Sequence, residues 1–91
     1  MTPRGFKKVL RYNATPVKFK YKKKDGSIRE AVGTTNFDLV PEEHQPKLAD
    51  ARAAEGLVKY YDTEKNGWRS AVEENLISFF DDGSNLEIMI D

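Results

Sequence analysis

The sequence has 91 residues, no cysteine and one histidine, His44. This length is typical of one domain, near the lower limit for folding without covalent or metal support. The lack of cysteine excludes disulfides and thiolate metal sites, and one histidine cannot form a histidine-rich metal centre. The core must therefore be built mainly from five Phe, four Tyr and one Trp, together with the aliphatic residues.

The net charge of zero hides a strong asymmetry along the chain. Residues 1–30 contain ten lysines and arginines but two acids, whereas residues 31–91 contain five bases and thirteen acids. The two segments therefore carry net charges of +8 and −8. A basic segment of this kind favours contact with a polyanion. The alternative is that the two halves fold together and neutralise each other, since nucleic-acid-binding domains are more often basic overall.

Residues 1–15 are predicted to form a basic, irregular N-terminal arm, because Thr2-Pro3, Gly5 and Asn13 interrupt a helical pattern. Nowhere in the sequence is there an apolar run approaching the ~20 residues that span a bilayer. The N-terminal segment also lacks the apolar stretch and cleavage site of a signal peptide. We therefore expect a cytoplasmic protein, in a bacterial host, that has no membrane partner.

From Val17 the pattern changes to an alternation of apolar residues and lysines, which predicts a half-buried strand. Asp25-Gly26 is typical of a two-residue hairpin turn, so the chain should return as a second strand over residues 27–34. A turn centred on this pair places Lys22 opposite Arg29. Two like charges would then face each other, an arrangement that an anion would make favourable.

The rest of the chain predicts a helix and further short strands. Alanine-rich residues 47–56, which end in glycine, favour a short helix within an insertion at 41–56. Strands follow at residues 57–62, 68–72 and 76–80, with Asn66-Gly67 as a second hairpin turn that places Lys65 opposite Trp68. The acidic residues 84–91 are a sixth strand or a tail. This pattern indicates a mainly β, strongly bent small barrel.

The order and spacing of several short motifs resemble the Sm-like SH3-barrel family related to WYL domains. The resemblance rests on a lysine-rich strand followed by Asp-Gly-x-x-Arg, Gly-Thr-Thr-Asn, Leu-x-Pro, Tyr-Asp and Gly-Trp-Arg-Ser. The corresponding residues are Asp25, Gly26, Arg29, Gly33–Asn36, Val40-Pro41, Tyr61, Asp62, Gly67–Ser70 and Ile77. It covers roughly residues 16–80 and implies a five- to six-stranded SH3-like (Sm-like) barrel at 16–83 with one short helical insertion. Because such short proteins are frequent in phages and bacteria, it also implies a phage-encoded protein.

The candidate binding residues are bases and aromatics on or near the predicted strands. Lysines and arginines can pair with phosphates, and exposed aromatic rings can stack on bases of a single strand. The candidates for anion or nucleic-acid contact are Lys18, Lys20, Lys22, Lys23, Lys24, Arg29 and Arg69, and those for stacking are Tyr21, Tyr60 and Trp68. The alternative is that the rings fill the barrel and the lysines discourage edge pairing of the strand.

We expect a non-enzymatic accessory or regulatory binding module that contacts single-stranded nucleic acid. No GxSxG or phosphate-binding glycine loop is present, and no nucleophile, base and orienting group converge in the sequence, so no catalytic residue is expected. The turn Asp81-Asp82-Gly83 does not have EF-hand spacing, so no metal or cofactor is expected. Alternatives are a protein-interaction module that docks on a host or phage enzyme or polymerase, a binder of small anionic nucleotides, and a homo-oligomer formed through oppositely charged faces.

Overall fold

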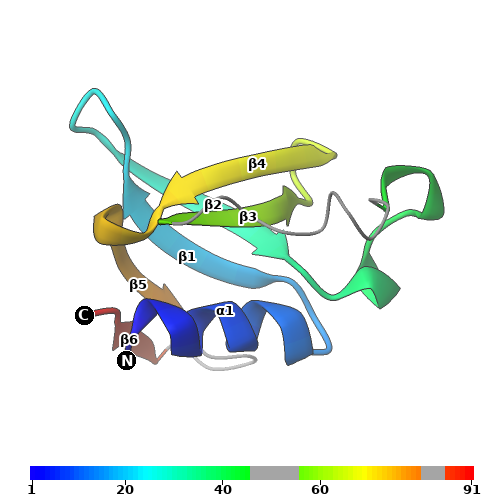
Figure 1. The fold of residues 1–91 in the computed structure, drawn as a ribbon, viewed down its shortest axis with the longest axis horizontal. Helices are drawn as coiled ribbons and strands as arrows, with labels where there is room; N and C mark the ends of the chain where they lie inside the picture. Colours follow the sequence, from blue (N-terminus) through cyan, green and yellow to red (C-terminus); the bar gives the residue numbers. More distant parts are fainter. Residues whose placement is uncertain (46–55, 81–85) are drawn as a thin grey trace.

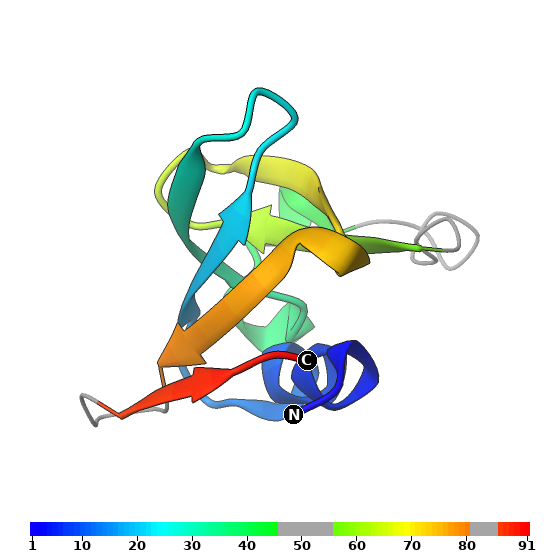
Figure 2. The same cartoon turned by 90° about the vertical axis from the view of Figure 1, so that its left-hand side faces the viewer.

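The computed structural model describes residues 1–45, 56–80 and 86–91 and shows one helix packed against a strongly curled sheet (Figures 1 and 2). In this part of the chain the elements are α1 (Pro3–Tyr12), β1 (Val17–Lys22), β2 (Ile28–Thr34), β3 (Leu57–Asp62), β4 (Gly67–Val72), β5 (Leu76–Phe80) and β6 (Glu87–Met89). The strands form one antiparallel sheet in the order β4-β3-β2-β1-β5-β6. The prediction of a mainly β, six-stranded architecture is confirmed.

The N-terminal segment is a helix, so the prediction of an irregular arm is wrong. The Thr2 hydroxyl accepts a hydrogen bond from the Gly5 N–H at 3.1 Å, and Pro3 occupies the first turn. The Asn13 N–H donates to the Val9 carbonyl at 3.0 Å and closes the other end. Thr, Pro and Asn at these positions are boundary signals of a ten-residue helix rather than interruptions of a longer one.

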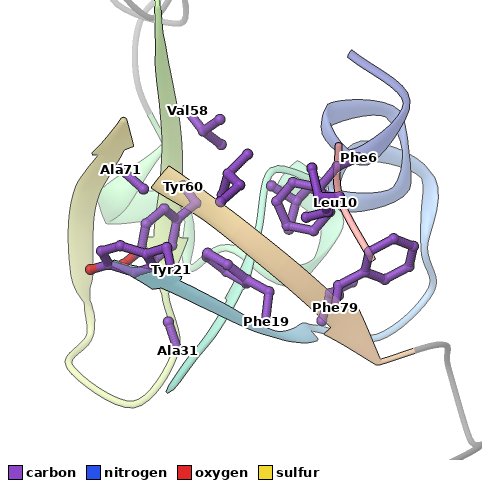
Figure 3. Packing of buried hydrophobic residues seen from close by; sticks show 12 residues of the cluster. Phe6, Leu10, Phe19, Tyr21, Ala31, Val58, Tyr60, Ala71 and Phe79 are labelled. Atoms are coloured by element: carbon purple, nitrogen blue, oxygen red, sulfur yellow. The ribbon is translucent and has the colours of Figure 1, made fainter. Parts of the chain in front are cut away.

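The core is an aromatic cluster to which the helix contributes directly (Figure 3). Phe6 and Leu10 of α1 are fully buried. The Phe6 ring lies 5.1 Å from Phe19 and 5.3 Å from Phe79, measured between centroids. Phe19 also meets Tyr60 edge-on at 5.0 Å. Helix, β1, β3 and β5 are thus joined by tilted and edge-to-face ring contacts, at centroid distances typical of aromatic cores.

The Gly-Thr-Thr-Asn segment at the end of β2, residues 33–36, holds the C-terminal end of α1. The Thr34 hydroxyl donates to the Leu10 carbonyl at 3.3 Å, and the Thr35 N–H donates to the same oxygen at 3.1 Å. The Asn36 amide donates to the Asn13 carbonyl at 3.0 Å. Carbonyls in the last turn of a helix lack intrahelical partners, so this segment satisfies groups that would otherwise need water.

The β1–β2 hairpin has a three-residue loop, and its predicted register is wrong by one residue. The Gly26 N–H donates to the Lys23 carbonyl at 3.0 Å, and Gly26 has a φ of 88°, in the left-handed region that glycine tolerates. Residues Lys24–Gly26 therefore form the loop, a common alternative to the two-residue turn. Tyr21 now pairs with Arg29, and Lys22 pairs with Ile28.

This shift turns β2 over relative to the prediction, since side chains alternate between the two faces of a strand. Ala31, rather than Val32, is paired with Phe19 and is fully buried. Arg29 lies on the same face as the inward-pointing Tyr21, so it does not face Lys22 across the hairpin. The expected like-charge pair is absent.

The β3–β4 hairpin also differs from its prediction. Asp62 pairs with Gly67 and Tyr61 pairs with Trp68, which leaves a four-residue loop at 63–66 in place of the expected Asn66-Gly67 turn. The Asp62 carboxylate accepts hydrogen bonds from the N–H groups of Glu64 and Lys65 at 2.9 and 3.0 Å. This side-chain cap selects the longer loop.

The predicted insertion lies mostly outside the described residues. Of the expected helix at 47–56, the structure describes Gly56, and the turn at residues 81–83 is likewise outside the described part. Phe37–Leu39, before the predicted insertion, and Glu42–His44, at its start, form 3-10 turns. In the described part of the chain, no helix has the length and apolar character needed to cross a bilayer.

We predict that Gly33→Ala destabilises the fold, because a Cβ at this buried position would lie 2.5 Å from Tyr60 Cδ2 and 3.1 Å from the Tyr61 carbonyl oxygen. Overpacking of this kind costs about 1–3 kcal/mol. Urea unfolding should show the loss, with Gly67→Ala as the control, since its Cβ would meet no atom closer than 3.9 Å. Equal midpoints for the two variants would contradict this packing.

We also predict an acid-sensitive contact at β6. Glu87 Oε1 accepts from the hydroxyl of buried Ser78 at 2.6 Å and lies 3.5 Å from Lys20 Nζ. The Ser78 hydrogen bond, aided by the Lys20 charge, lowers the pKa of Glu87 below its ordinary value of 4.5. Stabilisation from a lowered pKa is present above the ordinary value and is lost as the pH falls through the folded-state value.

Melting temperatures measured between pH 6 and pH 3 should therefore fall less steeply for Glu87→Gln than for the wild type. Glu74→Gln, at an exposed glutamate, is the matched control and should follow the wild-type curve. Superimposable curves for wild type and Glu87→Gln would show that this contact does not contribute.

Candidate anion-binding site

Four of the ten bases in residues 1–30 are neutralised by carboxylates within the described residues. Lys7 pairs with Glu73, Lys18 with Glu30 at 3.3 Å, Lys20 with Glu87 at 3.5 Å and Arg29 with Asp62 at 2.7 Å. Three of these four acids come from the acidic half of the chain. For these bases the two halves of the sequence neutralise each other, and the predicted anion contacts Lys18 and Lys20 already have acidic partners.

The tip of the β1–β2 hairpin keeps its positive charge. We define the hairpin tip as residues 22–28, all of which are exposed. Lys22, Lys23 and Lys24 form no ion pair with any described residue, and the only acid in the tip is Asp25. The tip therefore carries three lysines against one carboxylate and projects from the body of the molecule (Figures 1 and 2).

Asp25 shapes the tip rather than pairing with a lysine. Its Oδ1 accepts from the Ser27 N–H at 2.9 Å and from the Ser27 hydroxyl at 2.6 Å. These hydrogen bonds, with a smaller contribution from the nearby Lys23 charge, lower the pKa of Asp25. The short side chain thus closes the loop on itself and leaves the three lysine ammonium groups in solvent.

A second basic group, the arginine cluster of Arg29, Asp62 and Arg69, is organised by a buried carboxylate. Asp62 is fully buried, and its Oδ2 lies 2.7 Å from Arg29 Nη2 and 3.7 Å from Arg69 Nε. Burial is the largest single influence and works to lower the pKa of Arg29, but the Asp62 hydrogen bond and the contributions of Tyr21 and Tyr60 together outweigh it, so the net shift is upward. Two guanidinium groups share one carboxylate, so the cluster has a net charge of +1.

Two of the three predicted stacking residues are part of the core. Tyr21 is 8% exposed and Tyr60 is fully buried, and their hydroxyl oxygens are 3.2 Å apart. Burial, strengthened by the Tyr21 hydrogen bond, raises the pKa of Tyr60. Neither ring can stack on a base, so for these two residues the structure supports the alternative that they fill the barrel.

Trp68 is the third predicted stacking residue, and it is half-buried in a satellite aromatic cluster. Its indole N–H donates to the His44 carbonyl at 2.6 Å. Its ring meets Tyr61 at 5.7 Å and Phe37 at 6.4 Å, both edge-on, and Lys59 Nζ lies 5.7 Å from its centroid. Trp68 therefore keeps part of its surface exposed, but its orientation is fixed by the residues around it.

The role of Asp62 as the centre of the arginine cluster was not predicted from the sequence. A usable signal was present, because an aspartate at the end of a strand and just before a turn commonly accepts hydrogen bonds from the next N–H groups. The pairing with Arg29, 33 residues away, had no local signal. Among the described residues, no group of three or more His, Asp or Glu side chains is arranged to hold a metal ion.

We predict that Asp62→Ala is strongly destabilising, because it leaves Arg29 without its carboxylate and the loop at 63–66 without its cap. Removing one partner of a buried ion pair costs about 3–5 kcal/mol. Asp62→Asn should cost less, since its amide oxygen can still accept from the Glu64 and Lys65 N–H groups. Guanidinium unfolding of both variants checks the order, and an Ala variant as stable as the Asn variant would contradict it.

Comparison with protein-family models matches residues 6–77 to WYL_2, described as an Sm-like SH3 beta-barrel fold. The match begins within α1, so it includes the helix from Phe6 onward, whereas the resemblance began near residue 16. No curated protein and no solved structure matches the chain. The matched region contains most of the helix, both strands of the β1–β2 hairpin and the arginine cluster. The chain therefore belongs to the WYL_2 family of Sm-like SH3 β-barrels.

Proposed function

We propose that this barrel is a non-enzymatic binding module whose hairpin tip contacts the phosphate backbone of single-stranded nucleic acid. The observation that supports this is the contrast between paired and unpaired lysines on one hairpin. Lys18 and Lys20 have carboxylate partners, whereas Lys22, Lys23 and Lys24 have none among the described residues. Uncompensated lysines on an exposed loop are suited to phosphate contacts.

The support beneath the tip also favours this function. The strands that carry it are anchored by buried Phe19 and Tyr21, so the position of the tip is set by the core. A binding surface that is already ordered loses less conformational entropy on association than a mobile segment does. The three lysines themselves remain long and flexible, which suits contacts to a backbone without sequence readout.

A second candidate function is the binding of a small anion at the arginine cluster. Its support is the excess positive charge around Asp62 and the side-chain exposure of Arg69, which is 46%. Guanidinium groups bind phosphates and carboxylates through paired N–H donors. A nucleotide phosphate is the kind of anion that both this site and the hairpin tip could bind.

We predict that replacing Lys22, Lys23 and Lys24 by glutamine weakens binding of a fluorescently labelled single-stranded oligonucleotide, measured by anisotropy. Each lost phosphate contact should lower the salt slope by about 0.7, so three contacts lower it by about 2. Lys18→Gln with Lys20→Gln is the matched control and should have a smaller effect, because these lysines already pair with carboxylates.

Unchanged affinity and salt slope in the tip variant would exclude the hairpin tip as the contact. Binding of inorganic phosphate or a mononucleotide separates the two candidates. A small anion at the arginine cluster should bind the wild type and the tip variant equally well, because the tip lysines are not part of that site. Binding of a protein from lysate that persists after nuclease treatment, with no oligonucleotide binding, would favour a protein-interaction module instead.

A further inference from the structure

The solvent side of α1 carries a second basic surface, which we call the basic face of α1 and define as Arg4, Lys8 and Arg11. All three side chains are exposed. At about 100° per residue, they lie within roughly 60° of one another around the helix axis. The buried Phe6 and Leu10 lie on the opposite side. The fold thus turns one side of the helix inward and presents three cations on the other.

This arrangement is unfavourable for the helix alone. The helix contains no acidic residue in its sequence PRGFKKVLRY, and Arg4 stands in the first turn, where the helix dipole favours a negative charge. Arg4 and Lys8 are four residues apart and Lys8 and Arg11 three, spacings at which like charges destabilise a helix. A local conflict that the fold does not resolve is expected at functional positions.

The neighbouring Lys7 shows how the fold treats a base that it uses internally. Lys7 is half-buried and pairs with Glu73 just after β4. Arg4, Lys8 and Arg11 have no carboxylate partner among the described residues. The apolar side of α1 is already used by the core, so it is not available for insertion into a lipid surface. The basic face of α1 can therefore bind a partner only through its positive charges.

We infer that the basic face of α1 is a second contact for the phosphate backbone of a nucleic-acid strand, separate from the hairpin tip. This inference rests on the proposed function. With a rise of 1.5 Å per residue, the seven steps from Arg4 to Arg11 extend over about 10 Å. That length exceeds the size of one phosphate group, so the three bases suit consecutive phosphates along a strand rather than a single one.

An exposed aromatic ring lies beside this face. Tyr12 is 73% exposed, and the Arg11 guanidinium carbon lies 5.8 Å from its ring centroid. A ring of this kind can stack on an unpaired base while the adjacent arginine pairs with phosphate. Tyr12 therefore offers an exposed ring for stacking on a base, which the buried Tyr21 and Tyr60 cannot.

The two contacts are at opposite ends of the molecule, as both views show (Figures 1 and 2). A short oligonucleotide can occupy only one of them, whereas a longer strand can reach both. Linking two contacts on one strand raises the apparent affinity by far more than either contact alone. Dependence of affinity on strand length is therefore the property that distinguishes two contacts from one.

The experiment compares four proteins: wild type, a helix variant (Arg4→Gln, Lys8→Gln, Arg11→Gln), the tip variant described above, and the control Lys65→Gln, an exposed lysine in the loop at 63–66. Binding is measured by anisotropy with labelled single-stranded oligonucleotides of 6 and 30 nucleotides over a range of salt concentrations. We expect the helix variant to lose at least tenfold in affinity for the long strand and about 2 in salt slope.

The helix variant should melt close to the wild-type temperature, because it removes repulsion between the three bases but also loses the favourable Arg11 charge in the last turn. The melting temperature of each variant is measured alongside, so that a loss of binding can be separated from unfolding. If only the tip variant loses affinity, the inference is overturned and the proposed function stands. If only the helix variant loses affinity, the inference stands and the tip proposal fails. No binding by the wild type overturns both. Equal displacement of the oligonucleotide by poly-glutamate at the same salt would also overturn the inference, in favour of an acidic protein surface.

Discussion

The packing of Phe6 between Phe19 and Phe79 is the contact on which the arrangement of this molecule depends. It joins α1 to β1 and β5 through rings 5.1 and 5.3 Å apart and so fixes which side of the helix is buried. The hydrogen bonds from Thr34 and Thr35 to the Leu10 carbonyl then hold the other end of the helix. Because Phe6 and Leu10 occupy the core-facing side of α1, the three bases on the opposite side are exposed to solvent.

A buried acid has a comparable role at the β3–β4 hairpin. Asp62 closes the loop at 63–66 and pairs with Arg29, so one carboxylate serves both the local turn and a contact between distant strands. Together with the pairs of Lys7, Lys18 and Lys20, this contact provides carboxylate partners for four bases of residues 1–30. Uncompensated positive charge remains at the hairpin tip, on the basic face of α1 and, as a single excess charge, in the arginine cluster.

The strands could be predicted because alternation and turn residues are local signals, and the family resemblance supplied the barrel. The registers could not, since Asp25-Gly26 suits both two- and three-residue loops, and the choice of one turned β2 over. The helix was missed because Thr2-Pro3 was interpreted as an interruption. The partners of Lys20 and Arg29 come from residues far along the chain, and periodicity cannot distinguish a buried tyrosine such as Tyr60 from one that stacks on a ligand.

The strand β2 runs between these two charged regions. It leaves the hairpin tip after Ile28 and ends at Thr34, where it is hydrogen-bonded to the last turn of α1. Seven residues of extended chain span about 20 Å, and a strand in a sheet neither stretches nor shortens appreciably. The number of residues in β2 therefore sets the distance between the hairpin tip and the last turn of α1. An inserted or deleted residue would change this distance and would also move Arg29 to the other face of the strand.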